Sequence, residues 1–149
     1  MRKTICSLLL LYGFLSASAQ DPLHWQYSAK QVNDTTWAVH FTATIDGGWH
    51  VYSQTQPESS VAQPTEFHFT ASPLIRIKGK TKESGEVVHF SDPATGIGAN
   101  QYNGRVDFVQ TVIRKAKAKI SLTGTITYQT CTDQMCLPPK TVPFTVEMP

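Results

Sequence analysis

The chain has 149 residues, with 13 basic and 11 acidic residues and a formal net charge of +2 at pH 7. A nucleic-acid-binding domain needs a concentrated basic patch. The one candidate, residues 114–119, is better explained as a solvated turn whose lysines protect a strand edge from aggregation. We therefore expect no nucleic-acid partner.

Residues 1–19 have the organisation of a secretory signal peptide. Two basic residues precede an apolar run over residues 5–15, and small residues ending at Ala19 follow it. The run is eleven residues long, whereas a membrane-spanning helix needs roughly 20. We expect cleavage after Ala19, which removes Cys6 and leaves residues 20–149 as one exported domain without stable membrane insertion.

The rest of the chain has the pattern of β-strands. Apolar and polar residues alternate with a period of two, most clearly from Trp37 to Ile45, and no stretch shows sustained helical periodicity. Strands are predicted at residues 23–30, 36–45, 49–54, 65–70, 74–79, 86–90, 104–113, 120–130 and 141–147. The pattern predicts an all-β fold, a sandwich of about eight or nine antiparallel strands.

Two predicted connections are longer than hairpins need, namely residues 55–64 and 91–102. Long loops on a compact β scaffold are often functional. The second loop carries Ile97 between Gly96 and Gly98. It is either a lid with an apolar tip or a plain surface loop, and the plain loop is the commoner case.

The chemistry of the exported part centres on its only two cysteines, Cys131 and Cys136. They should pair in an oxidising compartment. A bond that closes so short a ring restrains the unfolded chain by only about 2 kcal/mol, whereas thiol–disulfide exchange needs two neighbouring thiols. This favours a redox role, with a purely structural disulfide as the alternative. Asp133 inside the ring disfavours a thiolate, so no built-in activator is evident.

No cofactor or other catalytic motif is expected. Zinc sites combine two closely spaced cysteine pairs, or one such pair with a closely spaced pair of histidines. The five histidines of the chain show no such spacing, so no metal is predicted. Nucleophile elbows and phosphate-binding glycine loops are absent from the sequence as well.

Three short segments carry a resemblance to a known family. Residues 128–131 are Tyr-Gln-Thr-Cys, and Cys136 is followed by Leu-Pro-Pro-Lys-Thr-Val-Pro. Upstream, residues 46–52 are Asp-Gly-Gly-Trp-His-Val-Tyr. Over most of residues 36–147 the chain resembles the amino-terminal periplasmic domain of the thiol:disulfide interchange protein DsbD. The resemblance implies an immunoglobulin-like β-sandwich with a redox-active disulfide at one end.

The resemblance also implies roles for individual residues. Cys136 would form the mixed disulfide with partner proteins, and Cys131 would resolve it. A cap loop that shields the disulfide would fall at residues 91–102, with Ile97 at its apolar tip. Tyr52 matches an aromatic position near the cysteines, although simple core packing explains a buried tyrosine equally well.

The implied function is a thiol–disulfide exchange module, part of a protein-disulfide reductase in the periplasm of a Gram-negative bacterium. A thioredoxin-like domain would supply electrons, and disulfides of periplasmic client proteins would receive them. In the family a membrane-embedded carrier and a thioredoxin-like domain follow, whereas this sequence ends at Pro149. We expect a stand-alone copy, either served by separate donors or acting as an adaptor. The alternative is an immunoglobulin-like envelope binding module with a purely structural disulfide.

Overall fold

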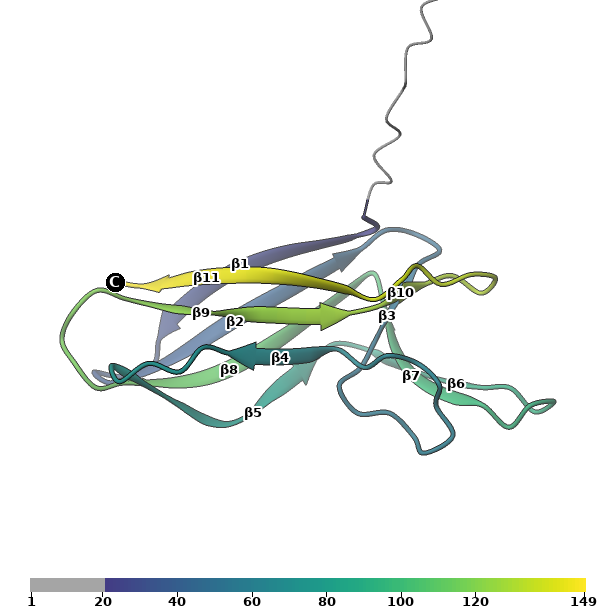
Figure 1. Ribbon diagram of the computed structural model, residues 1–149, viewed down its shortest axis with the longest axis horizontal. Coiled ribbons are helices and arrows are strands. Elements are labelled where there is room, and N and C mark those ends of the chain that lie inside the picture. Colours follow the sequence, from purple (N-terminus) through teal and green to yellow (C-terminus); the bar gives the residue numbers. More distant parts are fainter. Residues whose placement is uncertain (1–20) are drawn as a thin grey trace, which may run out of the picture.

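The computed structural model describes residues 21–149, and every regular element in this range is a β-strand (Figure 1). The signal peptide predicted for residues 1–19 lies outside the described part of the chain. Nowhere in residues 21–149 is there a helix long and apolar enough to cross a membrane. The prediction of an all-β fold is confirmed.

The described residues form eleven strands. They are β1 (Leu23–Gln31), β2 (Thr36–Ile45), β3 (His50–Tyr52), β4 (Glu66–Phe69), β5 (Ile75–Ser84), β6 (Val87–Ser91), β7 (Gly98–Asn103), β8 (Arg105–Arg114), β9 (Ile120–Tyr128), β10 (Thr130–Cys131) and β11 (Lys140–Met148). Three of them differ clearly from the strands that the sequence predicts. β7 forms within a predicted loop, β10 is separate from β9, and β5 continues past the predicted end at Gly79 to Ser84.

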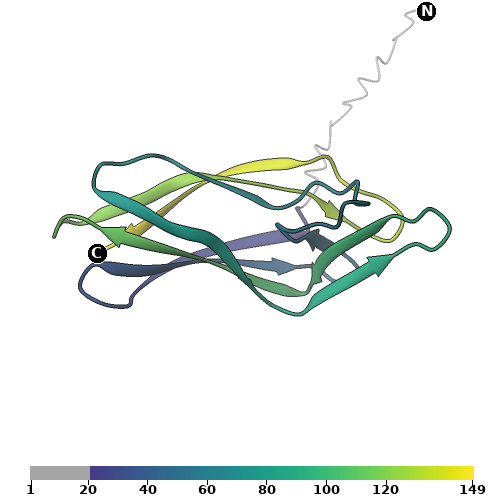
Figure 2. The ribbon, with the colours of Figure 1, turned by 90° about the horizontal axis from the view of Figure 1, so that it is seen from below.

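Two of the three sheets form the body of the sandwich (Figure 2). One has the strand order β1-β2-β8-β5 and the other the order β11-β9-β4, with antiparallel neighbours throughout. Alternate residues of β2 and β8 face inward, so that Val39, Phe41, Val106 and Phe108 are fully buried. Phe41 packs edge-on against Phe144 of β11, with ring centroids 4.8 Å apart. This is the immunoglobulin-like β-sandwich that the resemblance implied.

The third sheet, with strand order β10-β3-β7-β6, lies at one end of the sandwich (Figure 1). Because side chains alternate between the two faces of a strand, its faces bury different residues. Val51 and Tyr102 belong to the main core, whereas Tyr52, Ala99 and Cys131 form a separate cluster, called here the small cluster. The alternation therefore places Cys131 outside the main core.

Two tight turns join the third sheet to the body. Gly48 (φ 82°) lies between β2 and β3, and Gly104 (φ 67°) lies between β7 and β8. Both have left-handed conformations that glycine adopts without steric cost. The Ile45 amide donates a hydrogen bond to the Gly104 carbonyl at 2.8 Å, which ties the two turns together. The strands that carry the small cluster are thus fixed to the main core at their base.

Half of the segment predicted as a long loop, residues 91–102, is strand. β7 pairs with β3 on one side and with β6 on the other, which leaves only a short turn over residues 92–97. β7 begins Gly-Ala-Asn-Gln, without the β-branched residues that mark a strand in a sequence. Its conformation therefore depends on pairing with two neighbours, which local pattern does not reveal.

Candidate functional site

The two cysteines close a tight hairpin at the end of the third sheet. They face each other as an antiparallel pair and form a disulfide, with an S–S distance of 2.01 Å and Cα atoms 4.0 Å apart. On one side of the disulfide the Leu137 amide donates to the Thr130 carbonyl at 3.0 Å, and on the other the Thr132 amide donates to the Met135 carbonyl at 2.7 Å. Backbone hydrogen bonds on both sides therefore hold the disulfide in place.

The two bonded cysteines differ in exposure. Cys131, on β10, is 1% exposed and packs in the small cluster. Cys136, across the hairpin, is exposed, and the side chain of Met135 beside it is 54% exposed. Cys136 is therefore the surface cysteine of the pair, whereas Cys131 is shielded from solvent.

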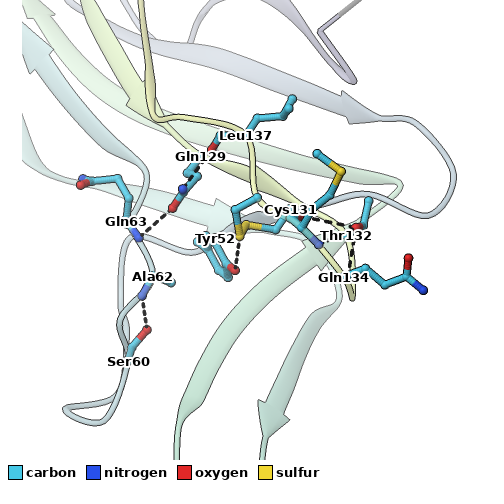
Figure 3. The surroundings of a disulfide bond; sticks show 11 residues. Tyr52, Ser60, Ala62, Gln63, Gln129, Cys131, Thr132, Gln134 and Leu137 are labelled. Atoms are coloured by element: carbon cyan, nitrogen blue, oxygen red, sulfur yellow. Dashed lines mark hydrogen bonds between the residues drawn. A yellow bond between two sulfur atoms is a disulfide. The ribbon is translucent and has the colours of Figure 1, made fainter.

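Tyr52 lies beside the disulfide, and a dashed line joins its hydroxyl to one of the two sulfur atoms in Figure 3, that of Cys136. The Tyr52 Oη atom is 3.9 Å from Cys136 Sγ, within hydrogen-bond distance for sulfur. Burial raises the pKa of the Tyr52 hydroxyl, so the group is a neutral phenol that can donate a hydrogen bond to a thiolate. The sequence left open whether Tyr52 lies near the cysteines or simply packs in the core. In the structure Tyr52 lies against the disulfide and belongs to the small cluster, not to the main core.

His50 is the next residue after Cys131 in the row of cross-strand partners that begins at Cys136, and the sequence alone did not identify it. Cys131 pairs with His50 of β3, and His50 pairs in turn with Asn103 of β7. His50 is 7% exposed, and its ring meets that of Tyr52 edge-on, 5.3 Å between centroids. Burial lowers the pKa of the imidazole, and the Asp133 carboxylate partly opposes this shift. Strand alternation places His50 on the same face as Tyr52, but only the register between β3 and β10 brings it next to Cys131.

A cavity of about 350 Å³ opens beside Cys136. Tyr52 and His50 line it from β3, and Phe90 and Ile97 line it from the β6–β7 hairpin. The residue expected at the tip of a cap is therefore close to the disulfide. It shares the cavity with the two aromatic side chains of β3.

The turn that carries Ile97 is organised by Asp92. The Asp92 carboxylate accepts hydrogen bonds from the Thr95 hydroxyl at 2.6 Å and from the Ala94 amide at 2.9 Å, and these bonds lower the pKa of Asp92. The Gly96 amide donates to the Asp92 carbonyl at 2.8 Å. Ile97 thus belongs to a short hydrogen-bonded turn over residues 92–97, which is shorter than the loop over residues 91–102 that the sequence predicts.

The other predicted loop, residues 55–64, forms the opposite wall of the cavity. It is fastened to β7 by a pair of hydrogen bonds: the Asn100 amide donates to Gln56 Oε1 at 3.0 Å, and Gln56 Nε2 donates to the Asn100 carbonyl at 2.7 Å. Ala62 packs against the small cluster, and Val61, which is 82% exposed, also lines the cavity. This predicted loop is present and encloses the site.

Glu83 of β5 anchors the start of that loop. Its carboxylate accepts hydrogen bonds from the Ser53 hydroxyl at 2.7 Å, the Gln54 amide at 2.6 Å and the Tyr102 hydroxyl at 2.7 Å. Burial and the neighbouring Glu83 carboxylate raise the pKa of Tyr102. One carboxylate therefore links the body of the sandwich to the end of β3 and to β7, on which the site is built.

The chemistry available at this site is that of two sulfur atoms and their neighbours. Within residues 21–149 no three His, Cys, Asp or Glu side chains are grouped so that they could hold a metal ion. Thiol–disulfide exchange uses two neighbouring sulfur atoms. The site places an exposed and a buried cysteine together, with the Tyr52 phenol and the His50 imidazole beside them.

Comparison with known proteins agrees with this chemistry. A family model described as the N-terminal part of the thiol:disulfide interchange protein DsbD matches residues 18–147. Among curated protein sequences there is no match.

Several solved structures share the fold. The reduced DsbD N-terminal domain of Neisseria meningitidis is 20% identical, with 82% of this chain and 84% of that chain covered and a TM-score of 0.50. The same domain in its complex with the PilB N-terminal domain is 18% identical, with coverage of 86% and 87% and a TM-score of 0.51. The N-terminal periplasmic domain of ScsB from Proteus mirabilis is 17% identical, with a TM-score of 0.58, and this chain covers 49% of it.

At these identities the structural likeness establishes the fold, and the family match establishes the relationship. The matched residues, 18–147, begin before β1 and extend into β11. They include the cysteine hairpin, both walls of the cavity and the aromatic residues of β3. The chain therefore belongs to the family of the N-terminal domain of the thiol:disulfide interchange protein DsbD.

Proposed function

We propose that this chain is a periplasmic thiol–disulfide exchange module that relays reducing equivalents to the disulfides of client proteins. The observation that carries the proposal is the asymmetry of the disulfide. Cys136 is exposed at a cavity, whereas Cys131 is buried behind it. A structural staple does not need such an arrangement, but exchange needs one sulfur open to a partner and a second one close by.

The reaction takes two steps in the reduced module. The Cys136 thiolate attacks a client disulfide, so that a bond forms between Cys136 and one client sulfur and the other client sulfur leaves as a thiolate. Cys131 then attacks Cys136 Sγ, the Cys131–Cys136 bond forms, and the electron pair of the broken bond leaves on the client sulfur. Two electrons pass to the client, and the two protons of the dithiol end on the two client thiols.

Tyr52 and Ile97 act on the exposed sulfur in this proposal. The Tyr52 hydroxyl, 3.9 Å from Cys136 Sγ, stabilises the thiolate by donating a hydrogen bond to it. Ile97 and Phe90 form an apolar rim on the same cavity. This rim limits access of water to Cys136 and offers an apolar contact to a docking partner.

The proposed partners are a thioredoxin-like electron donor and exported proteins that contain disulfides. Two relatives support this choice: the DsbD N-terminal domain of Neisseria meningitidis in its complex with the PilB N-terminal domain, and the ScsB domain, which is periplasmic. The predicted signal peptide fits the same compartment. On this proposal residues 20–149 are one redox domain, which acts as a component of a protein-disulfide reductase.

The reduction potential of the Cys131–Cys136 bond tests the proposal. The exported form is equilibrated in graded thiol buffers, and circular dichroism is recorded in parallel. A potential above roughly −300 mV with the fold retained supports exchange, because structural disulfides lie below that value. A lower potential, or unfolding on reduction, would favour the binding module with a structural disulfide.

A trapping experiment tests the roles of the two cysteines. A chromogenic aryl disulfide is added to each single variant, and the adduct is detected by mass spectrometry. Cys131→Ser should accumulate a stable mixed disulfide, because the attacking sulfur is present and the resolving sulfur is missing. Cys136→Ser should form little adduct, because its remaining thiol is buried. Faster labelling of Cys136→Ser than of Cys131→Ser would reverse the assignment.

A further inference from the structure

A row of directly opposed residues crosses the third sheet at the disulfide. It runs from Cys136 to Cys131, then to His50 and Asn103. Directly opposed residues in an antiparallel sheet have their side chains on the same face and their Cβ atoms about 5 Å apart. His50 is therefore the cross-strand neighbour of the buried cysteine, on the side away from Cys136.

The buried cysteine has a difficulty that the exposed one does not share. Cys131 must lose its proton when it attacks the mixed disulfide, because the thiolate is the nucleophile. It is 1% exposed, so bulk water cannot take the proton, and an apolar environment disfavours the thiolate. A proton acceptor within the protein is needed for this step.

We propose that His50 is the proton acceptor for Cys131 in the second step of exchange. This inference rests on the proposed function and assigns a residue to one of its two steps. His50 is itself 7% exposed, and it lines the cavity that also holds Cys136. It is therefore a cross-strand neighbour of the buried thiol that also borders the cavity beside Cys136.

In this second step the Cys131–Cys136 bond replaces the bond between Cys136 and the client. The sulfur of Cys131 forms a bond to Cys136 Sγ with its own electron pair, and its proton passes to a ring nitrogen of His50. The bond between Cys136 and the client sulfur breaks, and its electron pair leaves on the client sulfur. The imidazolium then returns the proton, through the cavity, to the client thiolate or to solvent. No further oxidant or reductant is required.

The surroundings of His50 suit both of its protonation states. Burial lowers the pKa of His50, so the imidazole is neutral near pH 7 and able to accept a proton. The Asp133 carboxylate acts in the opposite direction and stabilises the imidazolium once it forms. The titratable groups that face His50 come from its own strand, the hairpin and the turn before β3, and are Tyr52, Cys131, Cys136, Asp133 and Asp46.

Reaction with a chromogenic aryl disulfide separates the two steps in time. Reduced protein releases one equivalent of coloured thiolate when Cys136 attacks and a second when Cys131 resolves the adduct. His50→Gln keeps a polar side chain of similar length but cannot accept a proton at neutral pH. We expect the second phase to slow by roughly 100-fold, the lower end of general-base effects, while the first phase stays nearly unchanged. His68→Gln, an exposed site on β4, is the matched control and should change neither phase.

The pH profile distinguishes proton transfer from packing. In the unmodified protein the second phase should fall as the pH drops through the pKa of His50, and this inflection should be missing in His50→Gln. A second phase of unchanged rate in His50→Gln, or equal slowing of both phases, would overturn the inference. Absence of both phases in the unmodified protein would instead overturn the proposed function, so the two failures are distinguishable.

A measurement without any change at His50 covers the case in which His50→Gln does not fold. The aryl mixed disulfide of Cys131→Ser is stable, and NMR can follow the ring protons of His50 in it as the pH changes. The midpoint of that titration should agree with the midpoint of the second phase in the unmodified protein. Clearly different midpoints would exclude His50 as the acceptor.

Discussion

The main core and the small cluster are built from similar strands, but they differ in size and enclosure. The main core holds nineteen buried residues between the two sheets of the sandwich, whereas the small cluster has three, on the outer face of the third sheet. The disulfide belongs to the small cluster. The disulfide therefore lies apart from most of the interactions that stabilise the fold, and in the proposed function its bond opens and closes without disturbing them.

The largest effect on stability should come from the main core. Phe108 is fully buried and packs against Phe67, with ring centroids 5.3 Å apart. Phe108→Ala should lower the free energy of unfolding by about 3–5 kcal/mol, measured by urea denaturation of the oxidised protein. The matched control is Phe90→Ala on the rim of the cavity, where the side chain is 50% exposed. An equal loss in the control would contradict the distinction between the two regions.

Reduction of the disulfide should have a smaller effect. Opening the ring between Cys131 and Cys136 removes a restraint on the unfolded chain of about 2 kcal/mol, and the main core is untouched. Urea denaturation with and without a reductant measures the difference. Loss of the folded baseline on reduction would show that the disulfide holds the sandwich together after all.

Tyr52→Phe should change the reactivity of Cys136 and leave the free energy of unfolding nearly unchanged. The variant removes the hydroxyl 3.9 Å from Cys136 Sγ and keeps the ring. Loss of one hydrogen bond to a charged thiolate corresponds to about 1.5 kcal/mol, so the first phase with the aryl disulfide should slow about ten-fold. Tyr27→Phe, on β1 and packed against the main core, is the control. A Tyr52→Phe protein with an unchanged first phase would remove the proposed role of this hydroxyl.

The smallest expected effect is a pH dependence of stability that comes from Asp21 and not from the disulfide. Partial burial opposes the shift, but hydrogen bonds from Lys140 and Tyr128 hold the pKa of Asp21 below its usual value. A lowered folded-state pKa stabilises the protein above the unfolded-state value, and this contribution is lost as the pH falls through the folded-state value. Thermal unfolding should show it below about pH 4, and Asp21→Asn should flatten that part of the profile. If Asp21→Asn lost stability at low pH just as the unmodified protein does, this would count against a stabilising ion pair between Asp21 and Lys140.

Local pattern in the sequence was enough for most of the fold. The alternation from Trp37 to Ile45 predicts β2 and its buried face, because a strand that covers a core on one side must alternate. The short spacing of the two cysteines predicts a local hairpin disulfide for the same local reason. The loop over residues 55–64 also follows from the sequence, since it lacks alternation on both sides of a proline.

β7 and His50 were beyond such reasoning. The polar, glycine-containing segment of β7 is a strand because β3 and β6 pair with it. In the sequence β3 is far from β7, and β6 is separated from it by a turn. His50 carries no spacing signal of its own. It becomes part of the site only through its register with Cys131, which is separated from it by most of the chain.

By itself the sequence determined the class of fold, the partner of each cysteine and the family, because these depend on strand periodicity and on residues that are close together in the chain. Only the tertiary structure decided which sulfur is exposed and which is buried, which aromatic and imidazole groups lie beside them, and that the disulfide lies apart from the main core. These properties depend on the register between strands and on which face of the third sheet is covered, and both are set by contacts between distant segments.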